Sequence, residues 1–498
     1  MKLLSPQQIH EWDAYTIANE PIASIGLMER AARKCTDFII EENFIKTTIK
    51  IFCGKGNNGG DGLAIACQLI EAGYTPLVYI LEFGAKGTDD FQANLHRLHQ
   101  LTTSIHFIQA KEFFPGINEQ DLIIDALYGS GLNRPLKELS EQLVNHINQS
   151  AAWVISIDVP SGMFIDKTSK GNSIIKASYT LTFQSLKLCF LVAENADFFG
   201  VVKVLDIGLH PSFLQNINTD LELVTQEQVS SCIKPRKPFS HKGTYGHALL
   251  IAGNKGKMGA AILAARACLR SGTGLLTMNI PDDGLNILQT AVPEAMCAIR
   301  GDAIDYSKFS AIGIGPGLGT TEESKKLLEN LLENYSEPMV LDADALNILS
   351  ANREMLNIVS AGSVFTPHPK EFERLTGAAE DNFNRIALAL QLSLTHPFVI
   401  VLKGHYTLIA YQGKGYFNTT GNPGMAKGGS GDVLTGILTA LLSQGYSPLQ
   451  AALSGVYLHG LAADHALINQ SMETMIATDI IESLGAAFYD LLKEPSNP

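Results

Sequence analysis

The sequence predicts an α/β protein with two domains. Its 498 residues exceed the size of one ordinary domain. Short apolar runs of strand length alternate with helical patterns in two separate stretches of the chain. Such alternation is typical of mostly parallel sheets with helices on both faces, which form three layers.

Strand candidates and helical patterns alternate through the first half. The candidate strands are residues 49–53, 76–81, 121–127, 153–159, 179–183 and 201–206. The first of them is followed by a glycine-rich loop and by a helical pattern that runs through Ile70.

A stretch of different character, residues 210–242, divides the two halves. It contains Pro211, a polar run, and then Lys234-Pro-Arg-Lys-Pro-Phe-Ser240. Prolines and clustered basic residues are poor material for a helix or a central strand, so we place a linker near residues 215–235. The predicted domains are therefore residues 1–215 and 225–498. The second contains strand candidates at residues 248–252, 311–314, 339–341, 363–366, 398–402 and 406–410.

The composition favours a globular cytoplasmic protein. Hydrophobic residues make up 46% and charged residues 17% of the chain, and the formal charge of −13 argues against a nucleic-acid partner. The seven cysteines are scattered and odd in number, which signals neither a zinc site nor a disulfide framework. The N-terminus lacks the apolar core of a signal peptide, and no stretch reads as a membrane span.

The run Gly421-Asn-Pro-Gly-Met-Ala-Lys-Gly-Gly-Ser-Gly-Asp432 carries the strongest chemical signal. Apolar residues recur at helical spacing after Asp432, so the glycines precede a helix N-terminus. Backbone N–H groups at such an end bind anions, usually phosphate. A carboxylate there suits a base that takes a proton from a hydroxyl as it attacks phosphorus. The alternative is a glycine-rich turn in which Asp432 caps the helix.

Three loops in the first half carry a second chemical signal. The loop Gly54-Lys-Gly-Asn-Asn-Gly-Gly-Asp-Gly62 follows a strand and opens a helix, but no GK[ST] closes it as in a P-loop. Asp125-Ala-Leu-Tyr-Gly-Ser-Gly-Leu-Asn-Arg134 and Asp158-Val-Pro-Ser-Gly162 follow two further strands. Asn58, Asp125 and Ser161 offer oxygen ligands to a hard monovalent cation, and Arg134 can pair with a diphosphate. Each aspartate alone can also be a cap that stabilises its turn.

Together these three loops resemble the N-terminal domain of the YjeF family, whose members are NAD(P)H-hydrate epimerases. The similarity covers roughly residues 1–210. It implies a Rossmann-like three-layer fold and interconversion of the R and S forms at the hydrated carbon of a damaged nicotinamide ring. It also implies a potassium ion beside the substrate.

The resemblance assigns site residues to this sequence. Substrate contacts fall on Asn57, Asn58, Gly59, Gly60, Asp61, Gly129, Ser130, Gly131, Leu132, Asn133, Arg134 and Asp158, and potassium ligands on Asn58, Asp125 and Ser161. We expect Asp158 to be catalytic and to move a proton at the ring carbon, provided that the pocket raises its pKa. After Gly162 the chain departs from the acidic loop of small residues that is usual in the family.

Further motifs accompany the loop at residues 421–432. They are His241-Lys-Gly-Thr-Tyr-Gly-His247, Gly259-Ala-Ala261, Gly315-Pro-Gly-Leu-Gly319, Leu341-Asp-Ala-Asp-Ala345, Thr366-Pro-His-Pro369 and Lys403-Gly-His-Tyr-Thr407. Their order resembles the C-terminal domain of the same family, an NAD(P)H-hydrate dehydratase with a ribokinase-like α/β/α fold, over roughly residues 225–495. The resemblance implies that ADP in bacterial members, or ATP in eukaryotic ones, phosphorylates the hydrate. Phosphate then leaves and restores the reduced nicotinamide.

The resemblance also assigns the residues of the dehydratase site. Asp432 is the catalytic base, the hydrate contacts are Ala260, Gly317, His368 and Asp432, and the AMP contacts are Lys403, Gly404, His405, Tyr406, Thr407 and Gly431. Magnesium would neutralise the phosphates. A lone histidine is usually structural, but a rigid Pro-His-Pro should present the His368 ring outward to a ligand. Asp342 and Asp344 can equally serve to stabilise their own turn, and Lys427 either contacts phosphate or projects into solvent.

We therefore predict a bifunctional enzyme, an isomerase and a lyase, that repairs hydrated NAD(P)H. The resemblance implies a homo-oligomer. The alternative is a ribokinase-like small-molecule kinase with a non-catalytic N-terminal binding module. A kinase would leave the phosphate on its product, and a binding module would leave the R epimer unchanged.

Overall fold

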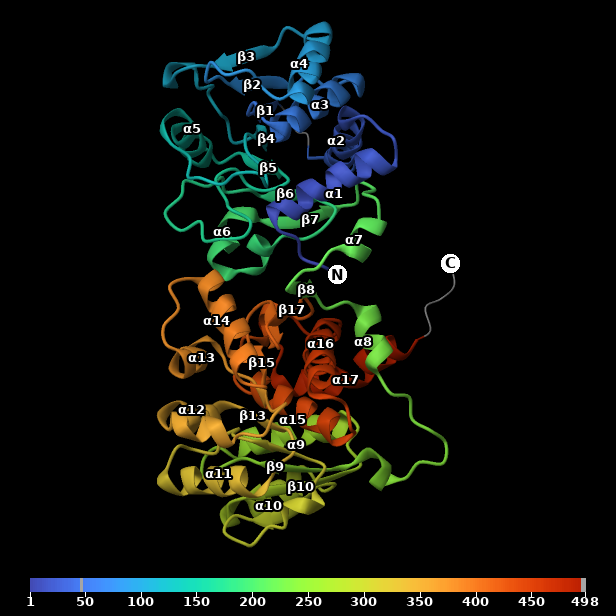
Figure 1. Ribbon diagram of the computed structural model, residues 1–498, viewed down its shortest axis with the longest axis vertical. Coiled ribbons are helices and arrows are strands. Elements are labelled where there is room, and N and C mark those ends of the chain that lie inside the picture. Colours follow the sequence, from blue (N-terminus) through green and yellow to red (C-terminus); the bar gives the residue numbers. More distant parts are fainter. Residues whose placement is uncertain (45–47, 494–498) are drawn as a thin grey trace. The chain divides into compact units, whose positions relative to one another are not determined.

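The computed structural model describes residues 1–44 and 48–493, and the chain forms two compact α/β units. The N-terminal unit contains residues 2–219 and 381–383, and the C-terminal unit contains residue 1, residues 220–380 and the chain from residue 384 onward. The predicted α/β class is confirmed (Figure 1).

Helices and strands alternate in the N-terminal unit, as the sequence predicts. Its strands are β1 (Ile49–Cys53), β2 (Leu77–Leu81), β3 (Ile105–Ile108), β4 (Leu122–Ala126), β5 (Trp153–Ile157), β6 (Tyr179–Phe183) and β7 (Val201–Leu205). Its helices are α1 (Pro6–Asn19), α2 (Ser24–Glu41), α3 (Asn57–Glu71), α4 (Asp89–Leu101), α5 (Glu138–Asn148), α6 (Ala196–Phe199) and α7 (Ser212–Asn216).

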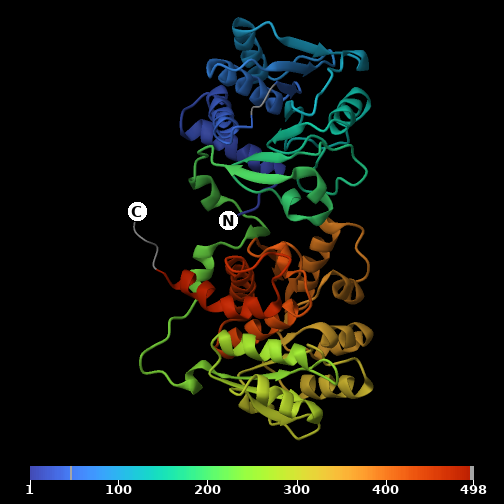
Figure 2. The same cartoon turned by 180° about the vertical axis from the view of Figure 1, so that it is seen from behind.

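The N-terminal strands form one parallel sheet in the order β3-β2-β1-β4-β5-β6-β7. Helices α2 and α3 bury their apolar sides against one face, and α5 covers the other, so the unit has three layers (Figure 2). The chain runs outward in opposite directions from β1 and β4. The crevice at the carboxyl ends of these two strands is therefore the switch point where such sheets bind ligands.

The C-terminal unit contains a larger mixed sheet. Its strands are β8 (Leu221–Leu223), β9 (His247–Ile251), β10 (Leu275–Ile280), β11 (Met296–Ile299), β12 (Ala311–Ile314), β13 (Met339–Leu341), β14 (Val364–Phe365), β15 (Val399–Leu402), β16 (Thr407–Tyr411) and β17 (Lys414–Asn418). Its helices are α8 (Gln226–Cys232), α9 (Met258–Arg270), α10 (Leu285–Ala291), α11 (Glu322–Asn334), α12 (Ala343–Ala351), α13 (Pro369–Thr376), α14 (Asn382–Thr395), α15 (Ser430–Ser443), α16 (Pro448–Ala466) and α17 (Ala477–Leu492).

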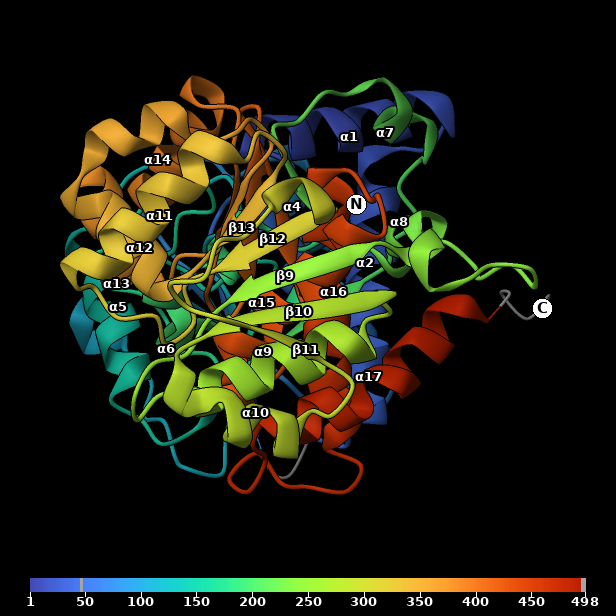
Figure 3. The ribbon, with the colours of Figure 1, turned by 90° about the horizontal axis from the view of Figure 1, so that it is seen from below.

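The strand order of this sheet is β11-β10-β9-β12-β13-β14-β15-β16-β17-β8, with only β16 antiparallel to its two neighbours. Helices α9 and α10 lie on one side of the sheet and α11 and α12 on the other (Figure 3). A Cβ at Gly436 of α15 would lie 2.2 Å from the carbonyl oxygen of Ala264 in α9. Glycine therefore lets these two helices pack at close range.

Two parts of the fold differ from the sequence prediction. The segment that we placed as a linker, residues 215–235, contains β8 and α8, and β8 pairs with β17 at the edge of the sheet. The strands β3, β10, β11 and β17 were not predicted. The boundary between the compact units falls at residues 219 and 220.

Candidate active sites

Glycines bring two of the predicted loops of the N-terminal unit together. A Cβ at Gly54, directly after β1, would lie 2.0 Å from the carbonyl oxygen of Leu127, directly after β4. A Cβ at Gly59 would lie 1.9 Å from the carbonyl oxygen of Gly54. Both positions require glycine because no side chain fits between these backbones. The first turn of α3, with Asn58, therefore lies next to the end of β4.

Asp125 and Ser161, two of the predicted cation ligands, are in direct contact. The Asp125 carboxylate is fully buried and accepts hydrogen bonds from Ser161 Oγ at 2.6 Å and from Ser161 N at 2.9 Å. Ser156 Oγ donates a hydrogen bond at 2.8 Å to Asp125 Oδ2, the oxygen that also accepts from Ser161 N. Burial raises the pKa of Asp125, while these hydrogen bonds act in the opposite direction.

Asn58 is the third predicted cation ligand, and its amide lacks a partner. Neither its Oδ1 nor its Nδ2 has a hydrogen bond within the described residues, although both atoms are buried. A Cβ at Gly129 would lie 3.1 Å from Asn58 Oδ1 and 3.3 Å from Asp158 Oδ2, so these residues surround one point. An unpaired buried amide costs free energy, so this arrangement fits a ligand that supplies the missing contacts.

Asp158 does not meet the condition for a proton carrier. It adopts a left-handed backbone conformation with φ +66°. Its Oδ1 lies 2.8 Å from Lys187 Nζ, and its Oδ2 accepts a hydrogen bond from Ser130 N at 3.1 Å. Burial would raise the pKa of Asp158, but the Lys187 ammonium and the Ser130 hydrogen bonds outweigh it and lower the pKa. The condition that the pocket raises its pKa is therefore not met, and Asp158 is a charged hydrogen-bond acceptor.

Two carboxyl groups that interact with Asp158, those of Asp61 and Asp13, have raised pKa values. Burial, followed by the charges of Asp158 and Asp13, raises the pKa of Asp61 well above its usual value. Burial and Asp158 raise the pKa of Asp13, on α1, to about 6. From the sequence, Asp61 was predicted only as a substrate contact, and neither Asp13 nor Lys187 was assigned a role. No loop motif surrounds Asp13. The importance of Lys187 is visible only in the structure, where its side chain is buried.

The other predicted substrate contacts of this unit differ in their surroundings. A Cβ at Gly60 would lie 2.8 Å from Met28 Sδ of α2, so this glycine serves helix packing. Asn57 lies exposed at the start of α3. Gly131, Leu132, Asn133 and Arg134 form a loop at the surface, where the carbonyl of Asn133 accepts a hydrogen bond from Lys167.

In the C-terminal unit, Asp432 lies in the first turn of α15. The helix follows Gly429, whose φ of +95° requires glycine, and its first N–H groups have no partner within the helix. Burial raises the pKa of Asp432 to about 6, with further contributions from the Asp342 and Asp344 carboxylates, against the opposing effect of Lys403. This predicted base is therefore poised to accept a proton near neutral pH.

Lys403 and Gly431, two predicted nucleotide contacts, lie side by side. A Cβ at Gly431 would lie 3.4 Å from Lys403 Nζ. Lys403 follows β15 and pairs with Asp342 Oδ1 at 2.8 Å. The remaining predicted contacts, Gly404, His405 and Tyr406, form the turn that leads into β16, which begins at Thr407.

Two of the predicted hydrate contacts, Gly317 and Ala260, lie side by side. Gly317 has a φ of +63°, and a Cβ there would lie 3.1 Å from the Cβ of Ala260. His368 caps α13, because its Nδ1 accepts hydrogen bonds from Lys370 N at 3.1 Å and Glu371 N at 3.3 Å. These hydrogen bonds orient the His368 ring. The side chain is 45% exposed, so part of the ring faces outward.

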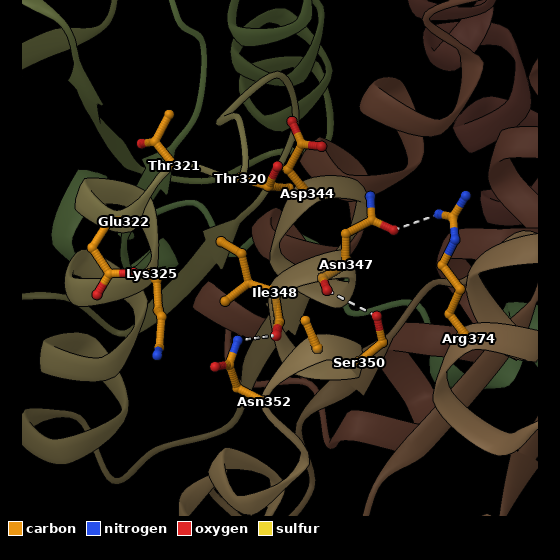
Figure 4. A pocket seen from close by; sticks show the side chains of 11 residues that line it. Thr320, Thr321, Glu322, Lys325, Asp344, Asn347, Ile348, Ser350, Asn352 and Arg374 are labelled. Carbon is orange, nitrogen blue, oxygen red and sulfur yellow. Dashed lines mark hydrogen bonds between the residues drawn. The ribbon is translucent and has the colours of Figure 1, made fainter.

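A cavity of about 660 Å³ borders the loop that contains Gly317 (Figure 4). Asp344 lines it and accepts a hydrogen bond from Gly319 N at 2.7 Å. At its other side, Arg374 donates to Asn347 Oδ1 at 2.6 Å. The lining residues are Thr320, Thr321, Glu322, Lys325, Asp344, Asn347, Ile348, Ser350, Ala351, Asn352 and Arg374.

Two residues in or beside the glycine-rich loop of residues 421–432 make contacts that the sequence does not predict. His459 of α16 was not predicted, and its Nε2 lies 3.4 Å from Ser430 Oγ. Burial and the nearby Lys403 lower the pKa of His459 to about 4, so its ring is neutral. Lys427 is exposed, and its ammonium donates a hydrogen bond to the carbonyl of Glu473 at the surface.

Across residues 1–44 and 48–493, no group of three or more His, Cys, Asp or Glu side chains could hold a metal ion. In the same ranges, no helix combines the length and the apolar character needed to cross a membrane.

Comparison with known families gives both halves a counterpart. Residues 24–189 match the model of the YjeF-related protein N-terminus, and residues 248–485 match that of NAD(P)H-hydrate dehydratase. The C-terminal unit is similar to the ADP/ATP-dependent NAD(P)H-hydrate dehydratase of Bacillus subtilis, co-crystallised with ATP and Mg²⁺. The identity is 34% and the TM-score 0.50, covering 55% of this chain and all of that one. Fold and sites thus define a class of enzyme in which a YjeF-type domain precedes a ribokinase-like dehydratase domain.

Relatives that match along nearly the whole chain identify the family within this class. The bifunctional NAD(P)H-hydrate repair enzyme of Moorella thermoacetica is 33% identical, covering 99% of this chain and 98% of its own. That of Escherichia coli K12 is 36% identical over 87% of this chain and 84% of its own. The chain belongs to the bifunctional NAD(P)H-hydrate repair enzymes, which are at once epimerase and dehydratase. The predicted function is confirmed.

Proposed function

We propose that residues 1–215 epimerise the hydrate and that residues 225–498 dehydrate its S form at the expense of ADP. The division into compact units at residues 219 and 220 supports this assignment. The observation that most directly supports the dehydratase is the position of Asp432 at the N-terminus of α15, close to Lys403. Burial there raises the pKa of Asp432 to about 6. The Bacillus subtilis relative, described as ADP/ATP-dependent, supports the nucleotide.

In the proposed dehydration, Asp432 takes the proton of the hydrate hydroxyl as that oxygen bonds to the terminal phosphorus of ADP. The bond from this phosphorus to the bridging oxygen breaks, and AMP leaves. The C–O bond of the phosphorylated hydrate then breaks, phosphate departs, and the adjacent ring carbon releases a proton to form the double bond. The free N–H groups of α15 and the Lys403 ammonium stabilise the transferred group, and magnesium supplies further neutralising charge.

The dehydratase should lose activity in acid because its base becomes protonated. We expect kcat to fall as the pH drops through about 6, the value to which burial and the Asp342 carboxylate raise the pKa of Asp432. Only the carboxylate form accepts the hydroxyl proton, so the loss lies on the acid side. Phosphate release from the S epimer, measured at saturating ADP between pH 5 and 8, tests this. A kcat that stays constant down to pH 5 would contradict the assignment.

For the epimerase we propose that Asn58, Asp125 and Ser161 hold a potassium ion beside the substrate. The supporting observation is the Asn58 amide, which is buried and without a hydrogen-bond partner in the described chain. Potassium supplies a fixed positive charge that orients the substrate. The Asp158 carboxylate, charged through its pairing with Lys187, accepts hydrogen bonds from the substrate, and Asp61 and Asp13 are the neighbouring groups able to carry a proton.

Replacing Asn58 with alanine should weaken potassium binding by about 10-fold, because one oxygen ligand is lost. Two measurements check this: the potassium concentration for half-maximal epimerisation, and the rise in melting temperature caused by potassium. Asn148→Ala is a matched control, since Asn148 donates to the Ile174 carbonyl at 2.7 Å and lies outside the proposed site. An unchanged potassium dependence in Asn58→Ala would remove Asn58 from the ligand set.

A further inference from the structure

Asp342 is a buried carboxylate to which sequence analysis gave no role beyond its own turn. It follows β13 and is 1% exposed. Its Oδ1 lies 2.8 Å from Lys403 Nζ, and its Oδ2 accepts a hydrogen bond from Thr435 Oγ1 at 2.8 Å. Thr435 belongs to α15, one turn beyond Gly431. One carboxylate thus links β13, the end of β15 and the first turns of α15.

This link fixes where the Lys403 ammonium lies. The ammonium is within 3.4 Å of the Cβ position of Gly431, at the end of α15 where unpaired N–H groups gather. Burial would lower the pKa of Lys403, but the Asp342 carboxylate outweighs it and raises the pKa, so the ammonium stays charged. A long side chain loses rotamer freedom here, which prepares a fixed positive charge for an arriving phosphate.

We propose that Asp342 is a positioning residue of the dehydratase that holds the Lys403 ammonium on the transferred phosphoryl group. This proposal rests on the proposed function, in which Asp432 is the base and α15 receives the phosphoryl group. In the proposed dehydration Lys403 contacts the group that moves, and Asp342 is the residue that holds it there.

Asp342 also supports the basicity of Asp432, because its carboxylate raises the pKa of that base. The charged groups that act on Asp432 are Asp342, Lys403 and Asp344, and those that act on Lys403 are Asp342, Glu371 and Asp432. Without the Asp342 carboxylate, Glu371 and Asp432 would be the remaining anionic groups that act on Lys403. An ammonium bound to Asp432 would lower the pKa of the base and weaken it. The same carboxylate therefore serves both the phosphate site and the basicity of Asp432.

The decisive variant is Asp342→Asn, which keeps the shape of the side chain and the partner for Thr435. We expect the dehydratase kcat to fall by about 100-fold, because one stabilising charge is no longer held in place. The KM for the hydrate should change little. The acid limb of the kcat profile should move by about one pH unit to lower pH, because Asp432 loses an anionic neighbour and gains the freed ammonium.

A purely structural role predicts a different result: a lower melting temperature with an acid limb that stays in place. That result, or a kcat within about threefold of wild type, would overturn the proposal. Asp121→Asn is the matched control, because it breaks a buried pair with Lys50 in the N-terminal unit and should leave dehydratase kinetics unchanged. Wild-type phosphate release under the same conditions separates failure of this proposal from failure of the proposed function.

Thr435→Val keeps the test open if Asp342→Asn does not fold. It removes only the hydroxyl that donates to Asp342 Oδ2. We expect kcat to fall by about 5-fold with little change in KM, since a single hydrogen bond contributes about 1 kcal/mol. A lowered melting temperature with unchanged kcat in this variant would contradict a positioning role for Asp342.

Discussion

Asp432→Asn should lower the dehydratase kcat by about 1,000-fold while the epimerase keeps its wild-type rate. Asparagine has nearly the same shape as aspartate but cannot take up the hydroxyl proton, so the phosphoryl acceptor is no longer activated. Binding of ADP should persist, because the N–H groups of α15 and Lys403 remain in place. Recovery of reduced-nicotinamide absorbance and release of phosphate from the S epimer measure the loss. Chromatographic separation of the R and S epimers follows the epimerase.

Asp479 offers a closely matched control for this prediction. Like Asp432, it lies in the first turn of a helix, and its Oδ2 accepts a hydrogen bond from Ile476 N at 2.7 Å. Asp479→Asn should cost about 1 kcal/mol of stability at most and leave both activities intact. If Asp432→Asn retained a tenth or more of the wild-type kcat, Asp432 would not be the base, since a general base contributes at least about 100-fold.

The buried central strands were the predictable part of the fold. Strands β1, β6, β12 and β13 match the predicted ranges, because each is a short run rich in apolar, aromatic or β-branched residues. Edge strands are only partly buried and carry a weaker pattern, as in β3 and β11, which were missed. In β10, Thr277 and Asn279 interrupt an otherwise apolar run. Strand β8 was mistaken for linker because its pairing with β17 is a long-range contact that no local pattern announces.

The candidate sites also have features that the sequence predicts and features that it does not. Glycine loops are local signals, so the positions of Asp125, Asn58 and Asp432 followed from the sequence. The charge state of each carboxylate depends on partners far along the chain. Lys403 is 61 residues from Asp342, and Lys187 reaches Asp158 from beyond β6. The raised pKa that a proton-transfer role of Asp158 requires is therefore not found, because Lys187 lowers this pKa.

The buried pair of Lys187 and Asp158 gives the second large expected effect. Lys187→Met should lower the epimerase rate by about 100-fold or more, because Asp158 loses the charge that holds its pKa down. Burial then favours the protonated carboxyl, which no longer offers a charged acceptor to the substrate. Lys187 is 2% exposed in its side chain, and removing one partner of such a pair destabilises a protein by about 3–5 kcal/mol. The R epimer should persist, whereas the S epimer is dehydrated at the normal rate.

Lys50→Met separates the loss of charge at the site from the loss of stability. Lys50 pairs with Asp121 in the same unit, and both side chains are buried, with 7% and 3% exposed. Breaking this pair should cause a similar fall in melting temperature, because it also leaves a buried carboxylate without its ammonium. The epimerase of Lys50→Met should nevertheless remain near the wild-type rate at temperatures where the unit is folded. If both variants lost the epimerase equally while folded, or if Lys187→Met kept it, Lys187 would be a structural lysine, and the charge of Asp158 would not matter for epimerisation.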